Sequence, residues 1–165
     1  MTKTEECLME AFAGESQANR KYLAFAAKAD QEGYAQIARL FRAAAEAETI
    51  HAHNHLRALK GIRGTRENLE EAIAGEGHEF KEMYPGMIDA AKAEGNAEAE
   101  RTFVYANEVE KVHHRLYEEA LTGMGSERES YSYYVCPVCG YTVGSEAPET
   151  CPVCGAKGKV FKKID

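Results

Sequence analysis

The sequence has no long hydrophobic run, no excess of basic residues and no apolar segment near its first residue. No apolar stretch approaches the roughly 20 residues that a helix needs to cross a bilayer, so we expect no membrane span. The net charge of −7 argues against a nucleic-acid-binding protein. Residues 1–15 are acidic and lack the apolar core of a secretion signal. We therefore expect a cytoplasmic protein that binds neither membranes nor nucleic acid.

Composition divides the chain into a long part and a short tail. With 165 residues, 44% of them hydrophobic, the chain can form one good core and a small appendage. The last 35 residues contain four of the five cysteines, in two Cys-x-x-Cys pairs. In a reducing compartment such pairs favour a metal site over disulfides. We expect Cys7, outside these pairs, to be a small buried or half-buried thiol.

Apolar residues recur with a helical period of 3.6 four times before residue 122. Glycines separate these segments, and residues 122–130 are rich in Gly, Ser and charge, which is typical of a linker. The pattern predicts a mainly α fold, a four-helix bundle about 38 Å long in residues 1–125, followed by a small domain in residues 131–165. The four helices are expected at about 4–31, 34–60, 66–94 and 97–121.

Two Glu-x-x-His motifs lie on apolar helix faces. Glu48 and His51 are three residues apart, so they project from the same face of a helix. Burying a carboxylate and an imidazole is costly unless they are neutralised and hydrogen-bonded, and a metal ion does both. Glu110 and His113 repeat the motif on the fourth helix. One such motif is weak evidence for a metal, but its recurrence strengthens the prediction.

One further glutamate precedes each motif at nearly the same distance. Glu15 lies 33 residues before Glu48, and Glu76 lies 34 residues before Glu110. Each half of the chain thus supplies one Glu and one Glu-x-x-His, the ligand pattern of ferritin-like di-metal bundles. Glu79 follows Glu76 by three residues on the same face and is an extra carboxylate that the first half lacks.

The third helix contains residues that disfavour helical structure. Gly75 and Gly77 flank Glu76, and each weakens a helix by about 1 kcal/mol relative to Ala. Pro85 must kink the helix or remove a backbone hydrogen bond. Irregularities of this kind often mark a functional site, and a simple bend in a long helix is the alternative.

The other histidines of the two motif-bearing helices are expected to be structural or solvated. His53 and His114 lie off the apolar stripes, which predicts solvent exposure. His55 lies on the stripe one turn after His51, and we expect a histidine at the edge of the core rather than a ligand.

The tail contains two Cys-Pro-Val-Cys-Gly knuckles, with eleven residues between Cys139 of the first and Cys151 of the second. Two such turns predict a tetrahedral four-thiolate site. The metal would fold a 35-residue segment that has too few apolar residues for a core. The spacing does not distinguish zinc, a structural metal, from iron, an electron carrier.

With its two predicted metal sites, the chain resembles the rubrerythrin family over essentially its full length. That family combines an α-helical diiron bundle with a rubredoxin-type iron centre, so the resemblance favours iron in the tail, with zinc as a substitute. The segments that carry the resemblance are AFAGESQANRKY, AEAETIH, AGEGHEFKEMYP, EVEKVH and the two CPVCG knuckles.

The resemblance implies a hydrogen peroxide reductase of anaerobic or microaerophilic metabolism, acting in defence against oxidative stress. Two sets of metal ligands follow from matching the family's motifs. The implied diiron ligands are Glu15, Glu48, His51, Glu76, Glu79, Glu110 and His113. The implied ligands of the rubredoxin-type iron are Cys136, Cys139, Cys151 and Cys154.

The resemblance also implies roles beyond ligation. In the family, one iron exchanges a Glu ligand for a His as the site is reduced, and the matching pair here is Glu79 and His51. Tyr22 and Tyr84 match positions that hydrogen-bond ligating carboxylates. Their periodicity alone fits aromatic core filling equally well.

The family further implies a homodimer or larger assembly, in which the tail of one subunit lies close to the diiron site of the other. A tail at the end of a bundle about 38 Å long would be too far from its own central site for useful electron transfer. The implied electron donor is NADH through a separate reductase, or rubredoxin.

Three other functions fit parts of the pattern. Iron oxidation and storage uses a similar ligand set, but storage has no need of a rubredoxin-like partner for re-reduction. An oxygen-reducing or hydrocarbon-type oxidase is the second, although the sequence indicates no substrate cavity. A structural protein with zinc at both sites is the third, and the carboxylate-rich ligand set argues against it.

Overall fold

The computed structural model describes residues 1–126 and 130–165 as two compact units, residues 1–63 and 64–165, each of which is described by itself. The chain is mostly α-helical, as predicted. No helix within the described residues is long and apolar enough to cross a membrane. Residues 127–129, in the predicted linker, lie outside the described residues.

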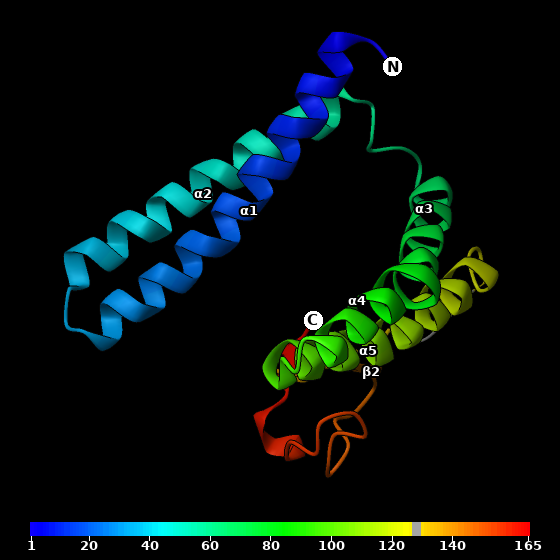
Figure 1. Cartoon of the computed structure of the whole chain (residues 1–165). Helices are drawn as coiled ribbons and strands as arrows, with labels where there is room; N and C mark the ends of the chain where they lie inside the picture. Colours follow the sequence, from blue (N-terminus) through cyan, green and yellow to red (C-terminus); the bar gives the residue numbers. More distant parts are fainter. Residues whose placement is uncertain (127–129) are drawn as a thin grey trace. The chain divides into compact units, whose positions relative to one another are not determined.

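The first unit is an antiparallel hairpin of two long helices, α1 (Lys3–Gln31) and α2 (Ala35–Ala58), which lie side by side in Figure 1. A capping box begins α1: the Thr2 side chain accepts from the Glu5 N–H, and the Glu5 carboxylate accepts from the Thr2 N–H. Gly33 adopts a φ of +83°, which lets the chain turn between the helices. Both helices begin and end within two residues of their predicted limits.

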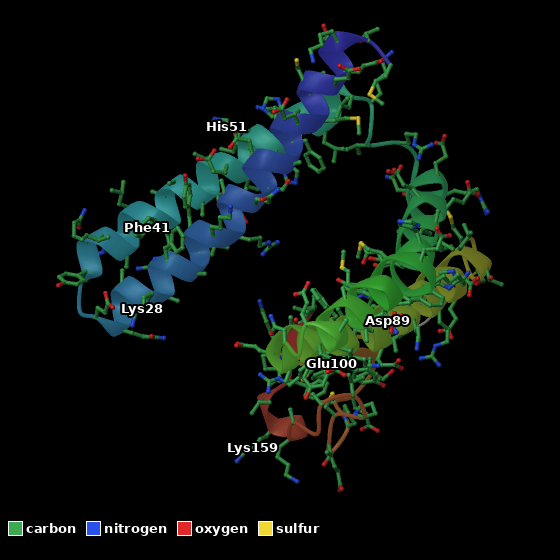
Figure 2. All side chains as sticks on the ribbon, viewed as in Figure 1. Lys28, Phe41, His51, Asp89, Glu100 and Lys159 are labelled. Carbon is green, nitrogen blue, oxygen red and sulfur yellow. The ribbon has the colours of Figure 1, made fainter. Side chains whose placement is uncertain are left out.

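Small residues form the contact between α1 and α2. They let the two backbones approach closely, whereas the stripe around Glu48 lies beside this contact. Near the turn, Phe41 packs against Tyr22 and Phe25, with ring centroids 6.1 and 5.6 Å apart (Figure 2). These ring contacts hold the hairpin closed at that end. The buried residues of the contact are Ala26, Ala29, Ala38, Ala45 and Ala52.

The sequence predicts the solvent exposure of three side chains in this hairpin, and two of the three predictions are confirmed. Cys7 is exposed, so the prediction of a buried or half-buried thiol is wrong. It precedes the half-buried Leu8 and, at 100° per residue, projects from a different face of α1. His53 is exposed and His55 is half-buried, both as predicted.

The second unit begins with helices that pair with one another in Figure 1. The predicted third helix is divided in two by a π-helical turn. Pro85 is the physical cause, because it has no N–H to donate to the preceding turn. Next to it, the Tyr84 N–H donates to the carbonyl of Glu79, five residues earlier. The segments are α3 (Thr65–His78), η1 (Glu79–Met83), α4 (Tyr84–Ala93) and α5 (Ala97–Thr122).

His114 is packed against α3 rather than solvated, so that prediction is wrong. Its side chain is 16% exposed and meets the Phe80 ring edge to face, with centroids 5.4 Å apart. Gly77 makes this possible, since a Cβ there would lie 3.2 Å from the His114 ring. The glycine after Glu76 therefore serves close packing of α3 on α5.

The tail forms a small three-stranded antiparallel sheet with strand order β2-β1-β3. In this order, β1 pairs with both other strands, and β2 contacts α5. The only buried residues in residues 130–165 are Cys136 and Cys151. The tail thus has almost no apolar core of its own. Its elements are β1 (Tyr133–Val135), β2 (Thr142–Gly144), the 3-10 turn η2 (Gly158–Val160) and β3 (Lys162–Ile164).

Candidate metal centres

The first cluster of ligand-type side chains consists of Glu15, Glu48 and His51. One carboxylate comes from α1, and the Glu-x-x-His pair comes from α2 (His51 is labelled in Figure 2). One ligand atom from each residue lies within 4.8 Å of the other two. His51 Nδ1 is 2.8 Å from a Glu48 carboxylate oxygen, as their spacing of three residues predicts. These three predicted ligands are therefore brought together.

Asn19 and Thr49 fix the two helices beside this cluster. The Asn19 side-chain amide donates to the Ala45 carbonyl at 2.7 Å and to the Thr49 hydroxyl at 2.8 Å. The Thr49 hydroxyl donates to the same carbonyl at 3.1 Å. Sequence reasoning missed this clamp. Asn19 lies one turn after Glu15, so a polar residue on that stripe was the available signal.

The second cluster repeats the first, with Glu76 from α3 and both Glu110 and His113 from α5. His113 Nδ1 lies 2.8 Å from a Glu110 oxygen and 3.7 Å from a Glu76 oxygen. All three side chains are largely buried, with exposed fractions of 27% or less. The predicted ligands of the second motif are therefore also brought together.

The two carboxyl groups of the second cluster have pKa values shifted in opposite directions. Burial raises the pKa of Glu76 to about 7, helped by its hydrogen bond with Glu110 and by the negative charge of Glu110. Burial also acts to raise the pKa of Glu110, but hydrogen bonds from His113 and Glu76 more than offset this and lower it. Without a metal, Glu76 holds a proton that it donates to Glu110. The same hydrogen bond to Glu110 raises the pKa of His113.

We expect the metal-free protein to become less stable as the pH rises from about 5 to about 8. Glu76 keeps its proton up to about pH 7 in the folded state, whereas its ordinary pKa is 4.5, so the folded state binds more protons in this range. Linkage then lowers the free energy of unfolding with rising pH, and the raised pKa of His113 acts in the same direction above pH 6.5. Allowing for partial solvent screening, the expected loss is about 1–2 kcal/mol.

Urea unfolding of metal-free protein at several pH values tests this expectation. Glu76→Gln should remove most of the slope, because the amide cannot titrate. A flat profile for the wild-type protein would contradict the assignment of the proton to Glu76.

Glu79, Tyr84 and Tyr22 are not part of either cluster. Glu79 begins η1, and burial and the charge of Glu110 raise its pKa. Burial and the charges of Glu110, Glu79 and Glu76 raise the pKa of Tyr84, so its hydroxyl lies near the second cluster. Within the described part of the chain, neither tyrosine hydroxyl hydrogen-bonds a carboxylate; Tyr22 packs against Phe25 and Phe41.

Tyr117 is a further residue near the second cluster that sequence reasoning did not assign to the site. Burial raises its pKa, as do the charges of Glu76 and Glu110. It lies four residues after His113 on α5, hence on the same helix face. Its helical spacing was the signal, but an aromatic residue at that spacing is equally typical of core packing.

The four tail cysteines form a compact cluster. Cys136 Sγ is 3.6 Å from Cys154 Sγ, and Cys139 Sγ is 3.5 Å from Cys151 Sγ. A disulfide would bring two sulfurs to about 2.05 Å. A tetrahedral metal with bonds of about 2.3 Å would hold them about 3.8 Å apart. The observed spacing therefore fits four ligands around one metal rather than disulfides.

Backbone geometry builds the two cysteine knuckles. Gly140 and Gly155 adopt φ values of +87° and +77°, conformations that favour glycine. The Gly140 N–H donates to the Cys136 carbonyl at 2.9 Å, and the Gly155 N–H donates to the Cys151 carbonyl at 3.0 Å. Each knuckle thus turns its two sulfurs toward a common point.

The thiol of Cys136 has a lowered pKa. Burial acts to raise its pKa, but hydrogen bonds from the backbone N–H groups of Val138 and Cys139 more than offset this and lower it. Burial raises the pKa of Cys139 and of Cys154. A thiolate at Cys136 is the form that binds a metal, so the knuckle favours the first ligand bond.

The four-Cys tail contacts the second cluster of the same chain. The ring nitrogen His113 Nε2 lies 2.9 Å from the Thr142 hydroxyl, and the Gly140 carbonyl is close enough to raise the pKa of His113. A Cβ at Gly140 would lie 3.6 Å from the buried side chain of Val109 on α5. The tail therefore lies beside the middle of α5, not beyond the end of the helices, and the distance argument for separation is wrong.

The donor sets fit the metals that the sequence predicts. Two clusters of carboxylate oxygens and one imidazole each are ligands that suit iron, and four thiolates suit iron or zinc. Glu76 with a raised pKa and a carboxylate neighbour is a group that a cation would deprotonate and stabilise. Carboxylates crowded in this way favour a cation between them.

Known proteins match this chain over nearly its whole length. The rubrerythrin family matches residues 6–121, and the rubredoxin-like domain of rubrerythrin matches residues 134–162. The chain is 39% identical to rubrerythrin-2 of Clostridium acetobutylicum, covering 96% of this chain and 95% of that protein. It is 36% identical to nigerythrin of Nitratidesulfovibrio vulgaris, covering 92% of this chain and 81% of that protein.

Solved structures of nigerythrin are also similar to this chain. Fully reduced, all-ferrous nigerythrin matches with a TM-score of 0.61 and 34% identity, covering 99% of this chain and 88% of that one. The match confirms the predicted fold class, mainly α with a small rubredoxin-like domain. Family and structural similarity extend over nearly the whole chain, and the chain therefore belongs to the rubrerythrin family.

Proposed function

We propose that this protein is a non-haem diiron peroxidase that reduces hydrogen peroxide to water in defence against oxidative stress. The two clusters, together with Glu79, would hold the two irons, and the four cysteines would hold a third. The observation that carries the proposal is the contact between Thr142 in the four-Cys domain and His113 in the second cluster. An electron-carrying centre beside a carboxylate site suits an enzyme that must be reduced again after each turnover.

The chemistry of the site divides between metals and protein. When bound, the irons polarise the O–O bond and supply two electrons, which with two protons convert one peroxide to two waters. In the metal-free protein Glu76 and His113 both have raised pKa values, so these two ligands release protons when a metal binds. Tyr84 and Tyr117 lie close enough to these carboxylates for the carboxylate charges to raise their pKa values. We further propose that Tyr22 and Tyr84 steady ligating carboxylates.

We propose that Glu79 and His51 alternate as ligands of one iron. Five carboxylates bring one more charge than two ferrous ions neutralise, so Glu79 is in excess in the reduced state and His51 is the better partner there. Two observations support this exchange. Glu79 lies in the irregular π turn, and π turns are frequent at functional sites. His51 is engaged only through Nδ1 within residues 1–126 and 130–165, so its ring is less constrained than that of His113.

Glu79→Ala is expected to retain two irons in the carboxylate site but to slow the redox cycle about 10-fold, an effect of the size seen for residues that support a metal site. Iron content and multiple-turnover peroxide reduction measure the two effects separately. Glu82→Ala is a matched control, because Glu82 is an exposed glutamate of the same π turn. Normal cycling of Glu79→Ala would show that the exchange is dispensable.

We propose that the protein acts in the cytoplasm as a homodimer or larger assembly. Its electrons would come from NADH through a separate reductase, or from rubredoxin. Support comes from the family and from the four-thiolate cluster, which suits one-electron exchange with such donors. Analytical ultracentrifugation and a search for a reductase that reduces the four-thiolate iron would test these points.

Iron oxidation and storage is the second candidate function, because the two clusters hold ligands of the type that ferroxidase sites use. It predicts fast reaction of the ferrous protein with oxygen and gives the four-Cys domain no role.

Anaerobic stopped-flow separates these candidates. Fully reduced, iron-loaded protein is mixed with peroxide and, separately, with oxygen-saturated buffer, and the visible band of the ferric four-thiolate iron is followed. A peroxidase restores the colour quickly with peroxide and slowly with oxygen. Faster recolouring with oxygen would favour the oxygen-reducing or ferroxidase function instead.

A further inference from the structure

His113 is held at both of its ring nitrogens. Nδ1 faces the carboxylates of the second cluster, 2.8 Å from Glu110. Nε2 faces the four-Cys domain and lies 2.9 Å from the hydroxyl oxygen of Thr142. The same hydroxyl lies 3.0 Å from the carbonyl oxygen of Gly140, the residue bonded to Cys139. One side chain thus joins a cluster of candidate iron ligands to a cysteine knuckle.

The hydrogen-bond directions in this chain follow from the available protons. The Gly140 carbonyl can only accept, so the single proton of the Thr142 hydroxyl is donated to it. The Thr142 oxygen is then an acceptor toward His113, and Nε2 must carry the proton that it receives. A neutral imidazole with its proton on Nε2 has its lone pair on Nδ1. The nitrogen that faces the carboxylates is therefore the one free to bind a metal.

The first cluster lacks an equivalent arrangement. His51 Nδ1 contacts Glu48, but no described residue hydrogen-bonds its Nε2. Its side chain is 53% exposed, against 27% for His113. A metal-bound histidine usually donates its second N–H to a fixed acceptor, which sets the tautomer and the ring orientation. Of the two motif histidines, only His113 has such an acceptor among the described residues, and that acceptor comes from the four-Cys domain.

The surroundings of the contact are shaped for close approach. Gly140 adopts a left-handed conformation and lies next to Val109, since a Cβ at Gly140 would be in ordinary van der Waals contact with that side chain. An apolar pocket of about 310 Å³ borders the contact, lined by Leu69 and Leu116 as well as by His113 and Thr142. Apolar walls strengthen a hydrogen bond by lowering the local dielectric constant.

We propose that Thr142 is a positioning residue that fixes the Nε2–H tautomer of His113 and couples the four-thiolate iron of a chain to the carboxylate site built on that same chain's α5. The coupling route runs from Cys139 through the Gly140 carbonyl, the Thr142 hydroxyl and the His113 ring. This inference rests on the proposed function and deepens it. The family implies a tail near the other subunit's site, whereas the contact between Thr142 and His113 lies within one chain. Each transfer oxidises one ferrous four-thiolate iron to ferric and reduces one ferric ion of the carboxylate site to ferrous. No covalent bond breaks, and both hydrogen-bond protons stay in place.

Thr142→Val tests the inference, because valine keeps the shape of threonine and removes the hydroxyl. Thr142→Ser keeps the hydroxyl, and Thr150→Val is a matched control at an exposed threonine of the same domain. The first readout is nitrogen NMR of histidine-labelled, zinc-loaded protein. Wild type and Thr142→Ser should show a slowly exchanging Nε2–H on His113, and Thr142→Val should lose it. This readout requires no turnover.

The second readout is the peroxide stopped-flow reaction of the iron-loaded variants, in two phases. Thr142→Val should slow recolouring of the four-thiolate iron about 10-fold or more, measured relative to oxidation of the carboxylate site in the same variant. Thr142→Ser and Thr150→Val should behave as wild type. Unchanged recolouring and an unchanged Nε2–H in Thr142→Val would overturn the inference, as would a defect that Thr142→Ser shares. Failure of wild type itself to recolour with peroxide would instead overturn the proposed function.

Discussion

Replacing Glu110 with alanine is expected to empty the carboxylate site of iron and to lower peroxide turnover by more than about 100-fold, since losing even an outer partner of a ligand costs about 10–100-fold. Glu110 is the residue on which the second cluster converges. One of its oxygens lies 2.8 Å from His113 Nδ1, and it shares a proton with Glu76. Without it, His113 Nδ1 loses its short carboxylate contact and Glu76 loses its proton acceptor. Iron analysis and steady-state peroxide reduction measure the two losses.

Glu108→Ala provides the matched control for Glu110→Ala. Glu108 lies two residues earlier on α5 and forms an exposed ion pair with Lys111. Surface ion pairs of this kind contribute about 0–1 kcal/mol, so this variant should keep its iron and its activity. If Glu110→Ala bound two irons and turned over normally, the second cluster would not be the reaction site. The four-thiolate iron should remain in both variants, because its ligands lie elsewhere.

Local geometry explains why the ligand pairs could be predicted. Residues three apart on a helix share a face whatever the rest of the fold does, so Glu48 lies near His51 and Glu110 near His113 as soon as the helices form. The helix limits followed from caps and from glycines such as Gly33, which are also local signals. The cysteine knuckles are predictable for the same reason.

The π turn and the packing of His114 were only partly predictable. Pro85 indicated an irregular helix, but the lost hydrogen bond can be absorbed by a kink or by a π turn, and only the structure distinguishes them. His114 looked solvated because it lies off the apolar stripe. The glycine at position 77 lets a polar ring pack against α3, and helical periodicity does not register a missing side chain.

The contact between Thr142 and His113 could not be predicted from the sequence. The two residues are 29 positions apart and belong to different domains, so their meeting depends on how the sheet lies against α5. Reasoning from helix length alone placed the tail at the end of the helices. The contact between Gly140 and Val109 instead places the tail beside the metal ligands of α5. That placement depends on tertiary packing.

Replacing Cys151 with serine is expected to unfold the tail and abolish electron delivery to the carboxylate site. The described tail buries only Cys136 and Cys151, so the metal, not an apolar core, must supply its stability. In small metal domains that contribution is about 10–16 kcal/mol, far more than a three-stranded sheet of three-residue strands can replace. Proteolysis and loss of the visible band measure the two effects.

Cys7→Ser is the matched control for Cys151→Ser, because Cys7 is an exposed thiol on α1 and belongs to no cluster. It should keep colour, protease resistance and turnover. Unfolding of the tail also removes Thr142 from His113, so Cys151→Ser should lose the protected Nε2–H in addition to the four-thiolate iron. The helices should survive, because α3, α4 and α5 pack on one another. A tail that stayed folded in Cys151→Ser would mean that its fold does not depend on a complete four-thiolate site.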